Sequence, residues 1–111
     1  MASFDILWSR YDDKFSCIIG YLSYNKNWTF EYDKEGVEVA KKLGFTMFPE
    51  FPNADDTYNS EKLFSTFDLR IRRTSKNISE EEKIELLTKT KGILQTDNIS
   101  IQRTMNLVKG R

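Results

Sequence analysis

The segment 28–33 restricts the fold more than any other part of this chain. Its sequence, WTFEYD, has an aromatic residue at every second position and a polar residue after each one. This alternation is typical of a β-strand that buries one face. A strand with an aromatic face needs neighbouring strands and a second layer that covers this face. The chain must therefore build a sheet and also supply its cover.

Three further segments are expected to join this strand. The run 15–22 is apolar on both of its alternating faces, and Asn25-Lys26-Asn27 supplies turn residues that tolerate a positive φ. An earlier strand is predicted around Phe4 to Trp8, with a turn at 11–13, and Ile99 to Ile101 fits a short returning strand. We therefore expect an antiparallel meander with one aromatic face.

Two helices are predicted from their ends. Apolar residues within 37–43 fit a short helix, and Gly44 occupies the position where a glycine often ends one. Ser79 and Glu82 form a capping box at the start of another helix, which we expect to end before Gly92.

A further helix is predicted to begin at Asn59 or Ser60. Its apolar stripe consists of Leu63, Phe64, Phe67 and Ile71. We expect the core to contain Trp28, Phe30, Leu63 and Phe67. The predicted fold is α+β, a small antiparallel β-sheet (meander) packed against two to three short helices. One domain is expected over residues 1–103, followed by a tail at 104–111.

Two residue counts exclude large classes of chemistry. The chain has no histidine, which excludes histidine bases and imidazole metal sites, and Cys17 is its one cysteine, which excludes an intrachain disulfide. We expect Cys17 to be a buried thiol in a reducing, cytoplasmic compartment. Seventeen basic residues balance seventeen acidic ones, so overall charge does not draw the chain to nucleic acid or membrane. The longest apolar stretch, 17–22, is too short for a membrane span.

No catalytic motif is present in the sequence. The five glycines are scattered and form no phosphate-binding loop, and adjacent acids such as Asp12-Asp13 and Asp55-Asp56 lack the spacing of a calcium loop. We therefore expect no catalytic residues, no metal site and no cofactor. The cluster of Arg70, Arg72, Arg73 and Lys76 is either a solvated helix end or a contact for phosphates or an acidic partner.

The segment 45–52, FTMFPEFP, is predicted to be extended, because each proline disfavours a helical conformation in the residue before it. Its aromatic residues could fill the core or form a binding surface. Residues 48–58 form a loop held by prolines at one end, and we expect Phe51 to be an aromatic anchor at its apex. The residues predicted to bind a partner are Phe48, Phe51, Asp55, Tyr58 and Arg70.

Six short motifs lie between Gly20 and Asp97, and the resemblance that their order and spacing carry extends over about residues 14–102. They are Gly20-Tyr-Leu22, Trp28-x-Phe30-x-Tyr32-Asp33, Phe48-Pro-x-Phe-Pro52, Tyr58-x-Ser60-x-x-Leu63-Phe64-x-x-Phe67-x-x-Arg70, Leu86-Leu-x-x-Thr90-x-Gly92 and Thr96-Asp97. In this order the chain resembles the small N-terminal domain of HipA-type toxins, and as a free-standing domain it is similar to HipS-like antitoxins. One departure is the run Ile71-Arg72-Arg73, where the family often has a proline.

The resemblance implies an antitoxin and not an enzyme. Such a protein would bind a HipT-like serine/threonine kinase toxin, take the place of the fused HipA N-terminal domain and obstruct the active site of the kinase. The resemblance also implies a ternary complex with a HipB-like DNA-binding protein, with no direct contact to nucleic acid. The alternative function is a nucleic-acid-binding or autoregulatory role for Arg70, Arg72 and Arg73.

Overall fold

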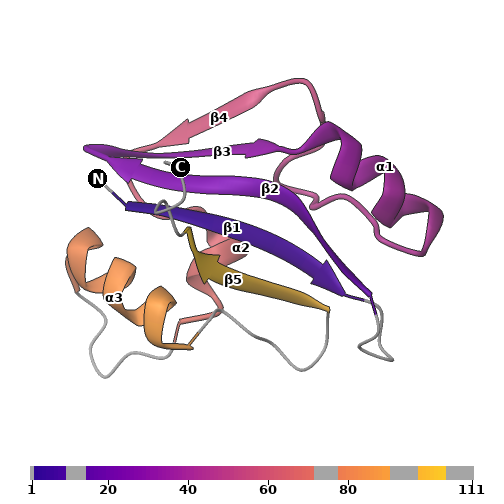
Figure 1. Cartoon of the computed structure of the whole chain (residues 1–111). Helices are drawn as coiled ribbons and strands as arrows, with labels where there is room; N and C mark the ends of the chain where they lie inside the picture. Colours follow the sequence, from indigo (N-terminus) through magenta and orange to yellow (C-terminus); the bar gives the residue numbers. More distant parts are fainter. Residues whose placement is uncertain (1, 10–14, 72–77, 91–97, 105–111) are drawn as a thin grey trace, which may run out of the picture.

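The computed structural model describes residues 2–9, 15–71, 78–90 and 98–104 (Figure 1). Five strands form one antiparallel sheet in the order β4-β3-β2-β1-β5. The strands are β1 (Ala2–Ser9), β2 (Ser16–Asn25), β3 (Asn27–Tyr32), β4 (Thr57–Ser60) and β5 (Ile99–Arg103). The three described helices are α1 (Lys34–Lys42), α2 (Ser65–Asp68) and α3 (Glu80–Thr90). The predicted α+β class is confirmed.

The predicted meander forms the centre of this sheet. β1, β2 and β3 pair in chain order, and Lys26, between β2 and β3, has a φ of 71°. β5 then returns beside β1, as expected for 99–101, and β4 adds to the outer edge of β3. The turn predicted at 11–13 lies outside the described residues.

The first predicted helix is confirmed as α1. Asp33 caps its start by accepting a hydrogen bond from the Gly36 backbone N–H at 3.0 Å, and Gly44 follows its end with a φ of 119°. β3 ends at Tyr32, which pairs with Gly20, so β2 continues beyond its partner. α1 packs along this free part of β2. A Cβ on Gly36 would lie only 1.8 Å from the carbonyl oxygen of Ile18, so the close approach requires glycine.

The helix predicted from Asn59 or Ser60 is wrong in its start and length. Both residues belong to β4, and the helix that follows is the single turn Ser65–Asp68. The backbone N–H and C=O groups of β4 form hydrogen bonds with β3, so they are not available for the hydrogen bonds of a helix that starts at these residues. Leu63 and Phe64 therefore enter the core from the connection before α2.

The core lies on one face of the sheet, and side chains of all three helices contribute to it. Trp28, Phe30, Leu63 and Phe67 are buried, as predicted. The aromatic residues pack on one another, with Phe30 stacked on Phe51 at a centroid distance of 4.4 Å. The aromatic face of β3 thus receives the cover that its alternation required.

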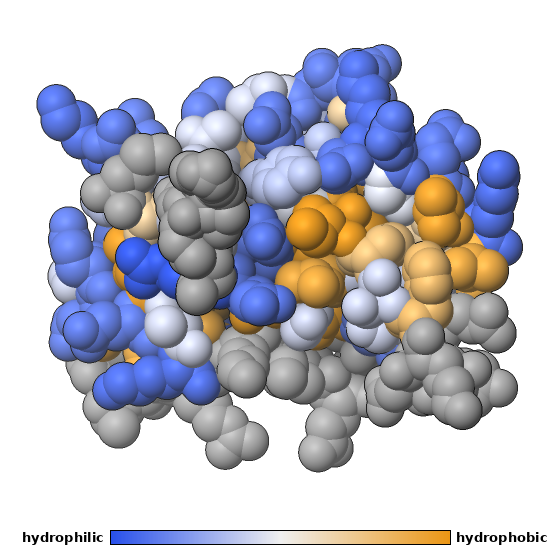
Figure 2. Space-filling view, in the orientation of Figure 1, coloured by the Kyte–Doolittle hydropathy of each residue, from blue (hydrophilic) through white to orange (hydrophobic). Residues whose placement is uncertain are grey.

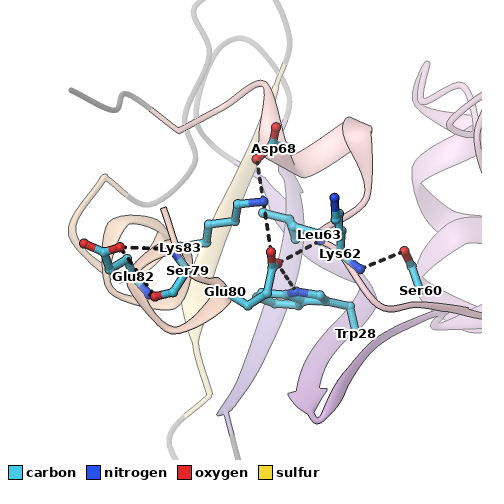
Figure 3. A network of polar contacts seen from close by, with 9 residues as sticks. All are labelled: Trp28, Ser60, Lys62, Leu63, Asp68, Ser79, Glu80, Glu82 and Lys83. Atoms are coloured by element: carbon cyan, nitrogen blue, oxygen red, sulfur yellow. Dashed lines mark hydrogen bonds and ion pairs between the residues drawn. The ribbon is translucent and has the colours of Figure 1, made fainter. Parts of the chain in front are cut away.

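α3 is attached to this layer through its first turn. The predicted capping box is confirmed: Ser79 Oγ accepts from the Glu82 backbone N–H at 3.1 Å, and Glu82 accepts from the Ser79 N–H at 2.9 Å. Glu80 turns toward the sheet and accepts from Trp28 Nε1 at 2.8 Å (Figure 3). Leu87 of α3 is fully buried, whereas Gly92, expected to follow the helix, lies outside the described residues.

β5 ends at Arg103, and Thr104 still bonds to β1. Its backbone N–H donates to the carbonyl oxygen of Ser3 at 2.9 Å, and its hydroxyl donates to the Asp5 carboxylate at 3.0 Å. Thr104 therefore extends the contact of the last strand with β1. Residues 105–111 of the predicted tail lie outside the described residues.

Candidate functional site

The structure places the predicted anchor Phe51 in the core. Its side chain is fully buried, and Phe48 is 8% exposed. The Tyr32 hydroxyl donates to the carbonyl oxygen of Phe51 at 2.7 Å and accepts from the Phe48 backbone N–H at 3.0 Å. The prediction of an exposed aromatic at a loop apex is therefore wrong. Phe30 and Tyr32 make this face of the sheet apolar, and the loop packs both rings onto it, which removes them from water.

Asp55 and Tyr58 stabilise the loop from its outer side. The Asp55 carboxylate is exposed and pairs with Lys34 at 2.8 Å, which lowers the pKa of Asp55 and raises that of Lys34. The half-buried Tyr58 donates its hydroxyl to the carbonyl oxygen of Asn53 at 3.0 Å and accepts from the Asn53 N–H at 2.9 Å. The Tyr58 ring also packs on Phe51. These contacts stabilise the loop, so Asp55 and Tyr58 have a structural role in the fold.

The side chain of Arg70 is buried and is not exposed on the surface. Its side chain is 6% exposed, and its Nε donates to the carbonyl oxygen of Thr66 at 3.0 Å. The hydroxyl of Thr66 in turn donates to Glu50 at 2.6 Å, which ties the short helix to the proline-containing segment. Arg72 and Arg73 lie outside the described residues. The described member of the basic cluster therefore supports the fold.

The described residues show little that could perform chemistry. No group of three or more potential metal-ligating side chains comes together among them. A cavity of about 350 Å³ is lined by Trp8, the segment 44–49 and Asn98–Ile99, and this lining contains no ionisable side chain. Cys17 is half-buried, and burial together with the nearby Asp33 carboxylate raises the pKa of its thiol. A raised pKa reduces the reactive thiolate at neutral pH.

The remaining candidate is the sheet face opposite the core, which we call the open face. In Figure 1 this face looks toward the viewer, and α2 lies behind the sheet. Register places on it the strand positions that alternate with the core residues. Those positions include Ser3, Asp5, Leu7, Ile18, Tyr21, Ser23, Thr29, Glu31, Thr57, Asn59, Ser100 and Gln102.

Apolar side chains gather at one end of the open face. Leu7 and Ile18 are directly opposite each other on β1 and β2, and both remain partly exposed. α1 packs along β2 and exposes Val39 (43%), and Leu43, which follows the last residue of the helix, is 39% exposed. We call these four residues the apolar patch. Figure 2 shows apolar surface concentrated in the part of this view occupied by β1, β2 and α1.

Negative charge lies next to the apolar patch. Tyr21 is 39% exposed and donates its hydroxyl to Asp33 at 2.6 Å. This hydrogen bond, burial, and the charges of Asp33, Asp5 and Glu31 raise the pKa of Tyr21 to about 12. The open face thus combines an exposed aromatic ring with three carboxylates.

Sequence reasoning missed this surface. Segment 15–22 was apolar on both faces, which was the available signal that one side of β2 would not enter the core. In the structure, Ile6 pairs with Gly20 and Leu7 pairs with Ile18, so β2 contains one extra residue, a bulge, between these two pairs. The sequence does not show where this bulge lies. This bulge places Ile18 and Tyr21 on the same face, although they are three residues apart.

Comparisons of the chain with protein-family models, with curated proteins and with solved structures give no match. Among the described residues, no helix combines the length and the apolar character needed to cross a membrane. The fold and the open face define the class of protein: a small α+β domain with an apolar patch exposed on its sheet and on the neighbouring helix α1.

Proposed function

We propose that this chain is a non-catalytic antitoxin that binds and neutralises a HipT-like serine/threonine kinase. In this proposal it occupies the place of the N-terminal domain that is fused to the kinase in HipA-type toxins. It acts in the cytoplasm, and DNA binding in the assembly belongs to a HipB-like partner. The proposal begins from the resemblance of the sequence motifs, and the structure adds a surface suited to binding.

The observation that carries the proposal is the apolar patch. Leu7 and Ile18 form a cross-strand pair whose side chains do not belong to the core cluster, and α1 extends the exposed apolar surface beyond them. Contiguous apolar surface on a small domain favours association with another protein surface. A rigid sheet also loses little conformational freedom when it docks, which favours affinity.

The test is to mix the purified chain with a purified HipT-like kinase and to measure kinase activity. Binding with inhibition supports the proposal. Leu7→Asp is expected to weaken both effects, because it places a charge in the apolar patch. Leu69→Asp is the matched control, since Leu69 is 61% exposed and lies at the end of α2, away from the open face.

Two results would contradict the proposal. One is the absence of a complex between the folded wild-type chain and the kinase. The other is stimulation of the kinase by the wild-type chain, since completion of an N-lobe would make the chain an activating subunit. Circular dichroism of each variant shows whether a lost effect reflects lost binding or lost folding.

A further inference from the structure

The open face is electrostatically one-sided although the chain as a whole is neutral. The full sequence has 17 basic and 17 acidic residues. Among the strand positions of the open face that the structure describes, the formally charged residues are Asp5 and Glu31, and Asp33 follows directly after β3. All of these charges are negative. The nearby Lys34 is held by Asp55 at 2.8 Å.

Tyr21 lies between these carboxylates. It is directly opposite Asp5 on β1 and Glu31 on β3, and its hydroxyl is bonded to Asp33. The hydrogen bond holds the phenol, so the partly exposed ring has a fixed position on the sheet. A fixed aromatic ring surrounded by carboxylates favours a cation, through attraction to the ring and to the surrounding charges.

The apolar patch begins at the next position along the open face from Tyr21 and its partner Asp5. Leu7 follows Asp5 at a distance of two residues on β1 and therefore lies on the same face beside it. A partner that covers Leu7 and Ile18 with an aliphatic side chain thus brings its neighbouring groups to Tyr21. A complementary partner surface therefore carries an apolar group opposite Leu7 and Ile18 and a cation opposite Tyr21.

A second copy of this chain does not fit these requirements. If two open faces were paired, the carboxylates around one Tyr21 would meet the acidic face of the other copy. Like charges that face each other across an interface repel and oppose association. Charge complementarity therefore favours a different protein with a basic surface.

We propose that the open face is the docking surface for the partner protein, and that the partner places a lysine or arginine side chain against Tyr21 while an aliphatic side chain covers Leu7 and Ile18. This inference rests on the proposed function, because the partner used to test it is the HipT-like kinase. It adds the surface and the chemistry by which that partner is recognised.

The experiment measures the dissociation constant of the kinase complex for two charge reversals. Glu31→Lys changes the open face, and Glu61→Lys makes the same change at an exposed position after β4. At about 50 mM salt, Glu31→Lys should weaken binding about tenfold, and Glu61→Lys by less than about twofold. The difference should shrink at about 500 mM salt, because screening shortens the reach of the charges.

Each outcome has a separate meaning. If Glu31→Lys and Glu61→Lys bind alike while Leu7→Asp abolishes binding, the recognition of a cation is refuted and the proposed function stands. If Leu7→Asp also binds like wild type, the docking surface is refuted. If the wild-type chain does not bind the kinase, the proposed function fails and this inference fails with it. A wild-type dimer that Leu7→Asp dissociates would assign the face to a second copy.

Discussion

Replacement of Glu80 should destabilise this protein far more than replacement of its neighbour Glu81. Glu80 accepts hydrogen bonds from Trp28 Nε1 at 2.8 Å and from the Leu63 backbone N–H at 3.0 Å. Its second oxygen lies 3.2 Å from Lys83 Nζ, which is also 3.6 Å from Asp68. One carboxylate therefore connects α3 with β3 and with the segment before α2 (Figure 3).

The magnitude follows from burial and from the number of partners. The side chains of Glu80 and Lys83 are 19% and 9% exposed, so water replaces the lost contacts poorly. Hydrogen bonds to charged groups contribute about 1.5–3 kcal/mol each, and breaking a buried ion pair costs about 3–5 kcal/mol. These contributions overlap, so we expect Glu80→Ala to lower the free energy of unfolding by about 3 kcal/mol. Glu80→Gln keeps an acceptor for Trp28 and should cost about 1–2 kcal/mol.

Urea denaturation followed by far-UV circular dichroism measures this difference. Glu81→Ala is the matched control, because Glu81 is exposed in the same helical turn and shares the favourable interaction with the helix dipole. That interaction is worth about 0.3–1 kcal/mol. If Glu80→Ala and Glu81→Ala destabilise equally, the network does not hold α3 to the sheet, and the reasoning is refuted.

The same carboxylate predicts a pH dependence. Burial raises the pKa of Glu80, but hydrogen bonds from Trp28, Leu63 and Lys83 outweigh it and leave the pKa below its ordinary value of 4.5. A lowered pKa in the folded state contributes stability above the unfolded value and loses it as the pH falls through the folded value. The stability difference between wild type and Glu80→Gln should therefore be full at neutral pH and decrease below about pH 4.5. A difference that grows on acidification would contradict the assignment.

Three other perturbations test separate parts of the structure. Phe51→Ala should lower the free energy of unfolding by about 3–5 kcal/mol, because the ring is fully buried. A variant that melts like wild type would contradict the placement of Phe51 in the core. Gly36→Ala should lower the melting temperature despite the better helix propensity of alanine, since the new Cβ would lie 1.8 Å from the Ile18 carbonyl oxygen. An unchanged melting temperature would contradict this contact. Spectrophotometric titration should assign a pKa of about 12 to Tyr21, by difference from Tyr21→Phe, and Asp33→Asn should lower it; an ordinary pKa in wild type would refute the hydrogen bond.

The parts of the fold that the sequence predicted are those with a strong local signal. The alternation of 28–33, the turn around Lys26 and the capping box of Ser79 and Glu82 each depend on residues close in sequence. The start predicted at Asn59 failed because helix and strand compete there, and pairing with β3 decided between them. Leu63 and Phe67 were nevertheless predicted as core, since burial depended on their apolar character and not on the length of the helix.

The candidate site was harder to predict for a physical reason. An aromatic side chain in a loop next to prolines has the same local sequence whether it covers a sheet or binds a partner. For Phe51, the deciding contact is with Phe30, which is 21 positions away in the chain. For Ile18, the deciding feature is a bulge that shifts the register of β2 against β1. Neither a long-range packing contact nor a bulge position is encoded in a local pattern.

The motifs that carry the resemblance to HipA-type domains and the residues of the proposed docking surface are largely different sets. Motif residues such as Trp28, Phe30 and Phe67 are fully buried. Leu7, Ile18 and Glu31, on the open face, are not motif residues, whereas Tyr21 and its hydrogen-bond partner Asp33 belong to both sets. Core residues determine how a chain folds, whereas exposed residues determine what it binds. Two chains could therefore share all of the buried motifs and still recognise different partners, so the open-face variants test the function more directly than any change in the core.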